Sequence, residues 1–196
     1  MPPPFPLKFY FFNLSENLLF HFCKALSKKI EMGLSNLGIF HTAVGIVAIG
    51  AALVSYVKYR KIDLATNSGR IYFYGTMVTS LTALGLSRNG GINPGHAFSL
   101  FIFLLAVVGY FLHAKRQGNA RARYFETFLL SFSFFLSLVP TVNETFTRVP
   151  VGNPLAKGPT DPVIGVTLLF LFILFLAGIS YQMVRQRKMN RSAQSD

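Results

Sequence analysis

The sequence predicts an all-α fold, a multi-pass transmembrane helical bundle of about five spans, with about four to six allowed by the pattern. Of the 196 residues, 52% are hydrophobic and only 13% are charged, about half the charged share of an ordinary soluble domain. The charges also gather in short clusters that separate long, almost uncharged stretches. A helix needs about 20 apolar residues to cross roughly 30 Å of hydrocarbon, and these stretches approach that length.

Five segments meet or approach the length of a span. They are residues 37–57, 71–87, 96–113, 124–142 and 163–184. The second is the shortest and is rich in Thr and Ser, so it must either include flanking residues or lie deep among its neighbours. The fifth is almost wholly Leu, Phe, Ile and Val in its central part, so we expect much of its circumference to face lipid. Prolines and glycines in the connection 143–162 predict an ordered surface loop.

Lys and Arg are unequally divided between the two sides of a five-span chain. The first and third connections and the C-terminal segment carry twelve of them, whereas the two loops on the other side carry three. The positive-inside rule then places the N-terminus outside and residues 185–196, a basic tail, in the cytoplasm. Residues 37–184 form the predicted transmembrane domain.

Residues 1–36 fit this topology least well, because their lysines would lie on the outer side. Two interpretations stay open. Either residues 5–23 form a sixth, weak segment, or the natural chain begins at Met32. Apolar residues from Leu18 to Ile30 recur every four positions, which is typical of an amphipathic interfacial helix. We favour a late start or an interfacial helix over a true span.

Composition excludes several classes of function. The single cysteine, Cys23, rules out an intramolecular disulfide and a multi-thiolate metal site. The net charge of +12 is explained by Lys and Arg flanking the spans, so the predicted partner is the lipid bilayer and not nucleic acid. The chain has no phosphate-binding glycine loop, nucleophile elbow, HExxH or CxxC, and whether it is an enzyme stays open.

Small residues recur at helical spacing in the first two spans and predict close helix packing. In the first span the stripe is His41, Gly45, Ala48, Ala52 and Ser55, and in the second it is Gly75, Thr79, Ala83 and Ser87. The first stripe turns His41 into the bundle. Such faces could also join copies of the chain as a homo-oligomer.

Four polar residues are candidates for a site at the outer face. His41 and His96 lie at the same predicted depth, and Glu144 and Arg148 follow the fourth span. The two imidazoles, His41 and His96, could bind a cofactor as the axial ligands of one b-type haem. His41, His96 and Glu144 could instead hold a transition metal. The same groups could bind or relay a proton or a small ligand, or they could be interfacial histidines beside a helix-stabilising Glu144–Arg148 pair.

Two further ionisable groups receive a structural interpretation. His113 is expected to be an interfacial group near lipid phosphates, because Lys115 and Arg116 follow it. Glu126 is expected to be a first-turn acid that the helix dipole and neighbouring arginines favour.

From His41 onwards the order of features resembles a family of bacterial predicted membrane proteins of unknown function. The features are an early histidine in the first span, a basic loop leading to Gly69-Arg70-Ile71-Tyr72, and then short Thr- and Ala-rich helices. The resemblance covers roughly residues 37–142, and the histidine expected just before Gly-Arg-x-Tyr is missing. It implies a bacterial inner-membrane protein with no established activity.

The leading functional interpretation is an integral inner-membrane protein with a ligand or metal site at its outer face. The first alternative is a membrane redox protein with a single b-type haem. The second alternative is transport of a small molecule or a proton.

Overall fold

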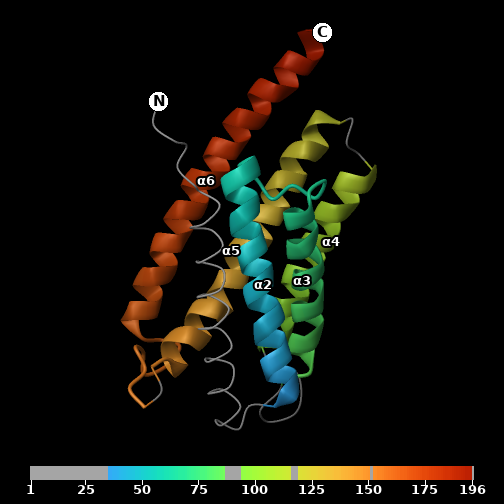
Figure 1. Ribbon diagram of the computed structural model, residues 1–196. Helices are drawn as coiled ribbons and strands as arrows, with labels where there is room; N and C mark the ends of the chain where they lie inside the picture. Colours follow the sequence, from blue (N-terminus) through green and yellow to red (C-terminus); the bar gives the residue numbers. More distant parts are fainter. Residues whose placement is uncertain (1–34, 87–93, 116–118, 151, 196) are drawn as a thin grey trace, which may run out of the picture.

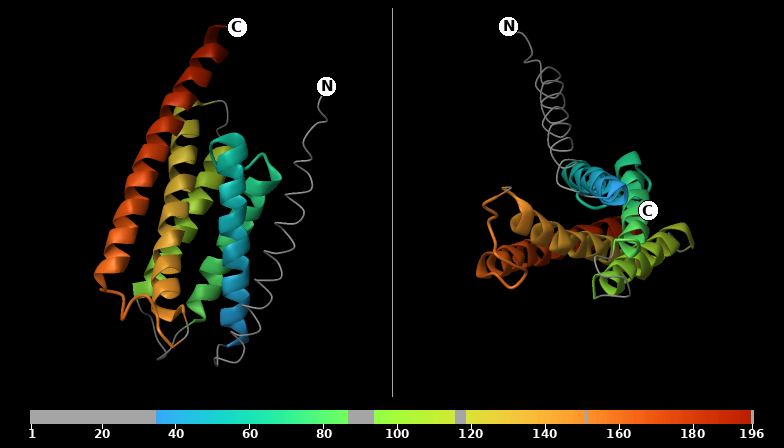
Figure 2. Two further views of the ribbon diagram at one scale, coloured as in Figure 1. Left: turned by 60° about the vertical axis from the view of Figure 1, so that its left-hand side comes forward. Right: turned by 90° about the horizontal axis from the view of Figure 1, so that it is seen from below.

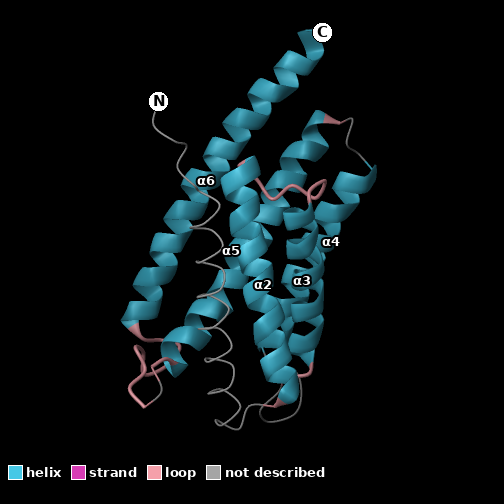
Figure 3. Ribbon diagram, viewed as in Figure 1, coloured by secondary structure: helices cyan, strands magenta, loops and turns pink. Residues whose placement is uncertain are grey.

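The computed structural model describes residues 35–86, 94–115, 119–150 and 152–195, and over these ranges the chain is helical with no strand (Figures 1 and 3). The helices are α2 (Asn36–Tyr59), α3 (Asn67–Leu84), α4 (Pro94–Lys115), α5 (Ala120–Arg148) and α6 (Pro162–Ser195). The predicted all-α bundle is confirmed. The predictions for the N-terminal segment, including Cys23 and Met32, concern residues outside the described ranges.

Four of these helices, α2, α4, α5 and α6, are long and apolar enough to cross a membrane. The 18-residue α3 is not among them. It nevertheless runs between the same two ends of the bundle as its neighbours (Figure 1), and at helical rise its residues extend over about 27 Å. The architecture is that of an integral membrane protein with about five helical passes.

Each helix packs mainly against the next helix in the chain. The main contacts join α2 to α3, α3 to α4, α4 to α5, and α5 to α6. Seen from below, α3 lies between α2 and α4, and α6 lies at the far side of α5 (Figure 2). The shortest helix, α3, is therefore flanked by neighbours on two sides, while Ile71, Tyr74 and Leu81 on its open side are exposed.

The α2–α3 contact is made by small residues. A Cβ atom added to Gly75 would lie 2.7 Å from the Cβ of Ala48, which is closer than side chains pack. Ala48 and Ala52 are buried, and the Ser55 hydroxyl donates to the Lys61 carbonyl in the following loop. The predicted packing stripes thus face each other within one chain.

The centre of the bundle is built from aromatic side chains around α5. Tyr72 of α3 is buried, and its hydroxyl lies 2.7 Å from that of Ser133 on α5. The ring of Phe134 packs against those of Tyr72 and Tyr56, at centroid distances of 6.1 and 5.4 Å. This cluster joins α2 and α3 to α5, so α5 is the helix on which the bundle is assembled.

Phenylalanines also form the α5–α6 contact. Phe135 of α5 packs against Phe175 and Phe172 of α6, with centroids 5.2 and 5.6 Å apart. The rest of the α6 circumference is open, and Val166 and Phe170 are 67% and 60% exposed. The prediction that this helix presents much of its surface to lipid agrees with that exposure.

Helix ends differ from the predicted spans because capping and polar residues extend them. α3 begins at Asn67, since the Thr66 hydroxyl accepts the backbone N–H of Gly69. α5 runs through Pro140 to Arg148, so residues 143–148 are helical where a loop is predicted.

Residues 185–195, which lie in the predicted basic tail, continue α6 as helix (Figure 1). At the other end of α6, the Asp161 carboxylate accepts the backbone N–H groups of Lys157 and Val163. These two bonds hold the pKa of Asp161 below its usual value, so the carboxylate stays charged as the helix cap.

Candidate functional site

His41 lies in the first part of α2 and is turned towards α3, as the small-residue stripe predicts. Its Nδ1 lies 3.0 Å from the hydroxyl oxygen of Thr82, near the end of α3. The side chain is half-buried. The pair joins the two helices close to the end of the bundle at which α2 begins.

The hydrogen bonds of Thr82 decide which nitrogen of neutral His41 carries the proton. The Thr82 hydroxyl lies 2.8 Å from the Val78 carbonyl and has one hydrogen, which it donates to the backbone. Thr82 therefore accepts from His41, which assigns the proton to Nδ1. The other nitrogen, Nε2, then carries a lone pair, the state in which an imidazole binds a metal.

His96 lies in the first turn of α4, at the same end of the bundle, and is 8% exposed. Burial at a helix start is unusual for a polar ring and indicates packing among the neighbouring helices. The predicted equal depth of His41 and His96 agrees with the starts of α2 and α4 at one end of the bundle (Figure 1).

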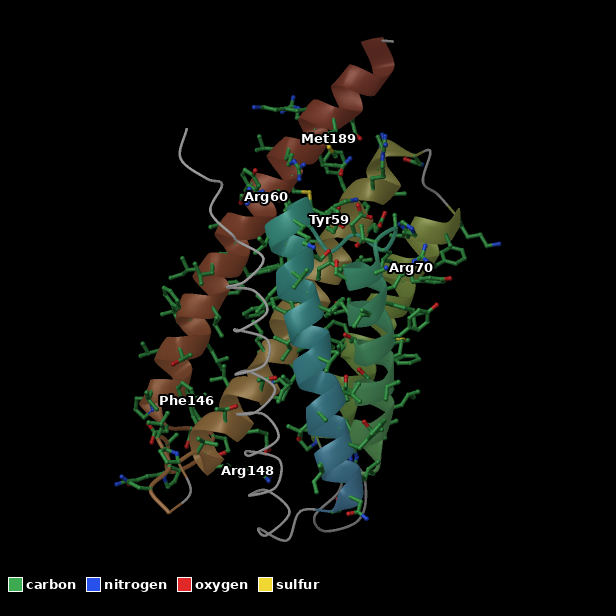
Figure 4. The ribbon with its side chains drawn as sticks, in the orientation of Figure 1. Tyr59, Arg60, Arg70, Phe146, Arg148 and Met189 are labelled. Atoms are coloured by element: carbon green, nitrogen blue, oxygen red, sulfur yellow. The ribbon has the colours of Figure 1, made fainter. Side chains whose placement is uncertain are left out.

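Glu144 and Arg148 form an ion pair one turn apart on the last part of α5, and both side chains are substantially exposed. This is the helix-stabilising i,i+4 arrangement. Figure 4 shows Arg148 and Phe146 on the part of α5 beside the start of α6. Over the described ranges, no three His, Cys, Asp or Glu side chains come together as a metal-binding group, so Glu144 is not assembled with the histidines here.

At the opposite end of the bundle the structure pairs two residues that the sequence analysis treats separately. Nδ1 of His113 on α4 lies 2.8 Å from a carboxylate oxygen of Glu126 on α5, and Glu126 is 4% exposed. Glu126 is thus a buried partner of His113. The prediction that it is a first-turn acid is wrong, because α5 begins at Ala120 and its first turn has no acid. The signal for this pair is that both residues lie within two turns of the connection between two antiparallel helices.

A row of buried amides on α6 was also missed. Gln182, Gln186 and Asn190 recur every four residues and are 6%, 3% and 7% exposed. Gln182 accepts a hydrogen bond of 2.9 Å from Ser131 of α5, and Gln186 donates one of 2.9 Å to Asn190. Their spacing is visible in the sequence, but they lie beyond the most apolar part of the segment, where a search for spans gives them no weight.

Comparison of the chain with family models, with curated proteins and with solved structures gives no match. The resemblance to a bacterial membrane-protein family therefore stays a prediction.

Proposed function

We propose that this chain is an integral inner-membrane protein that binds a small ligand or a metal ion at its outer end, where α2 and α4 begin. His41 is the ligand-contacting residue and His96 its partner. The N-terminus is outside and the C-terminus is cytoplasmic in this proposal, because Lys and Arg are concentrated at the opposite end of the bundle.

The observation that carries the proposal is the hydrogen bond between His41 and Thr82. A metal-binding imidazole usually donates its second N–H to a fixed acceptor, which sets the ring orientation and makes the other nitrogen a better ligand. Thr82 supplies that acceptor at 3.0 Å, and its own hydrogen is used by the Val78 carbonyl. The arrangement supports coordination or hydrogen bonding through Nε2 of His41.

The test is titration of the purified, detergent-solubilised protein with Zn²⁺ and, separately, with haemin. His41→Ala and His96→Ala should abolish binding of the species that the protein accepts. Thr82→Val should weaken it by about tenfold or more, since the supporting hydrogen bond is lost while the side-chain volume is kept. Metal analysis and the visible absorption spectrum supply the readouts.

Thr167→Val on α6 is the matched control, because Thr167 also bonds to its own helix, through the Val163 carbonyl. It should leave binding unchanged. A reduced b-type absorption band that disappears in both histidine variants would identify haem as the ligand. Loss of metal binding in Glu144→Ala would indicate a three-ligand metal site, and unchanged metal binding would indicate a histidine pair. If neither Zn²⁺ nor haemin binds, or if binding survives in His41→Ala, the proposal is wrong.

A further inference from the structure

A second binding site is suggested by a cavity of about 270 Å³ at the opposite, basic end of the bundle. It lies between the end of α2, the α2–α3 loop, α5 and α6. Figure 4 shows Tyr59, Arg60 and Met189, three of its lining residues, gathered at the end from which α6 projects. This site is separate from the outer-end histidines.

The wall of the cavity is strongly cationic. Lys58, Arg60, Lys61 and Arg185 line it, whereas Asp63 is the one carboxylate among its lining residues. Asp63 lies 3.8 Å from the ammonium group of Lys61 and so offsets one cation. Three further cations then line a small cavity that is partly open to the surroundings, and this excess of positive charge favours an anion.

The local backbone holds two of these cations at the cavity. Arg60 follows the last residue of α2 in the left-handed conformation, with φ of 65°, and its N–H donates to the Tyr56 carbonyl over 2.9 Å. Arg185 of α6 donates from Nη1 to the Tyr59 carbonyl over 2.6 Å. That carbonyl belongs to the last turn of α2 and lacks a partner within the helix, so Arg185 both caps α2 and remains at the cavity wall.

The inner part of the cavity is lined by neutral hydrogen-bonding groups. Thr127 of α5 and Gln182 and Gln186 of α6 line it, and all three are buried. Gln186 donates one N–H to Asn190, and its amide nitrogen carries a second hydrogen that can be donated to a ligand. Cations around neutral donors are the combination that binds phosphate oxygens.

We propose that this cavity binds a phosphate group, carried either by an anionic lipid headgroup or by a small soluble phosphate ester. The volume suits one phosphate with a short polar substituent and lies slightly below the range of drug-sized pockets. Apolar side chains next to the cavity residues are open to the surroundings: Val57 is 71% exposed and Val184 is 58% exposed. They offer a surface for acyl chains, which favours the lipid source.

The experiment measures binding to the full-length protein in a neutral detergent. The lipid probe is dioleoyl phosphatidylglycerol, with dioleoyl phosphatidylcholine as the zwitterionic comparison, and binding is followed by native mass spectrometry. The soluble probes are inorganic phosphate and glycerol 3-phosphate at constant ionic strength, followed by the thermal shift. Binding of phosphatidylglycerol alone identifies a headgroup site, and binding of the soluble probes identifies a soluble ester. Either result supports a phosphate site.

The key variant is the double substitution Lys58→Gln with Arg60→Gln, at two exposed positions on the cavity wall. Each cation near a membrane surface contributes about a factor of five in affinity, so the pair should weaken binding about thirtyfold. The matched control is Lys115→Gln with Arg121→Gln, which removes the same charge from exposed positions at the same end of the bundle, outside the cavity. Its affinity should stay within about twofold of the unaltered protein.

A variant that should bind more tightly distinguishes a change at the site from a loss of folding. Asp63→Asn removes the carboxylate from the cavity but keeps the side-chain oxygen that accepts from the Ala65 N–H. It should strengthen binding by about fivefold. The proposal is overturned if both double variants weaken binding equally, if phosphatidylcholine binds as well as phosphatidylglycerol, or if no probe binds.

Discussion

Helices α3 and α6 differ in how they are accommodated in a lipid bilayer. α3 is short, lies between α2 and α4, and buries hydroxyl side chains and a close glycine contact with α2, while its third side carries exposed apolar residues. α6 is long and apolar, contacts α5 through phenylalanine rings and leaves most of its surface open. The comparison shows that apolar length marks a helix that meets lipid, whereas small and hydroxyl residues mark the helix faces that other helices cover.

The largest expected effect concerns topology, because α3 either crosses the membrane or does not. With Cys23 replaced by Ser, a cysteine at Leu86, just after α3, should react with a membrane-impermeant thiol reagent on intact cells. A cysteine at Ala65, just before α3, should react only after lysis, and a reporter fused after Arg191 should be cytoplasmic. If Leu86→Cys also needs lysis, α3 does not cross and the span count is too high by one.

The next effect in size is steric. Gly69→Ala would place a Cβ 2.0 Å from the Asp63 carbonyl oxygen, so the α2–α3 loop must move, and we expect a loss of about 3 kcal/mol in the free energy of unfolding. Gly178→Ala on α6 is the control, because nothing lies within 4 Å of its added Cβ. Unfolding by SDS titration measures both. Equal losses of unfolding free energy in the two variants would contradict the close contact at Gly69 and the open space at Gly178.

The smallest effect comes from one hydrogen bond. Tyr72→Phe removes the buried bond to Ser133, whose hydroxyl keeps its own acceptor, the Leu130 carbonyl, so the expected loss is about 1 kcal/mol. Tyr181→Phe on α6 should change the free energy of unfolding by about 0.5 kcal/mol or less, since Tyr181 is 56% exposed. The same SDS titration compares them. A larger effect at Tyr181 would mean that α6 is covered by something other than lipid.

Periodicity and apolar length predict the helices and their packing faces, including the contact of the His41 stripe with α3. They do not predict where the helices end. Thr66 caps α3 and α5 continues beyond Pro140, and both depend on hydrogen bonds that an apolar count ignores. For Pro140, the hydroxyls of Ser137 and Thr141 bond to carbonyls one turn earlier, which helps a helix to tolerate proline.

The polar pairs were less predictable than the helices, because each joins residues on different elements. His113 and Glu126 meet only when α4 and α5 pack as an antiparallel pair, and Gln182 meets Ser131 only in one rotation of α6. At the end of the bundle where α2 and α4 begin, the sequence places His41 and His96 at one depth, but the role of Thr82 depends on how α2 faces α3.

The row of amides on α6 fixes the rotation of that helix about its own axis. Phenylalanine rings tolerate small turns, because their contacts have no single donor and acceptor. The hydrogen bonds from Ser131 to Gln182 and from Arg185 to the Tyr59 carbonyl do not tolerate such turns. Gln182 and Arg185 lie in the same half of α6. A twist of α6 would break both bonds together, whereas a tilt that pivots on this half would preserve them. The half of α6 with these bonds therefore sets the rotation of the helix, and the phenylalanine contacts with α5 hold the other half.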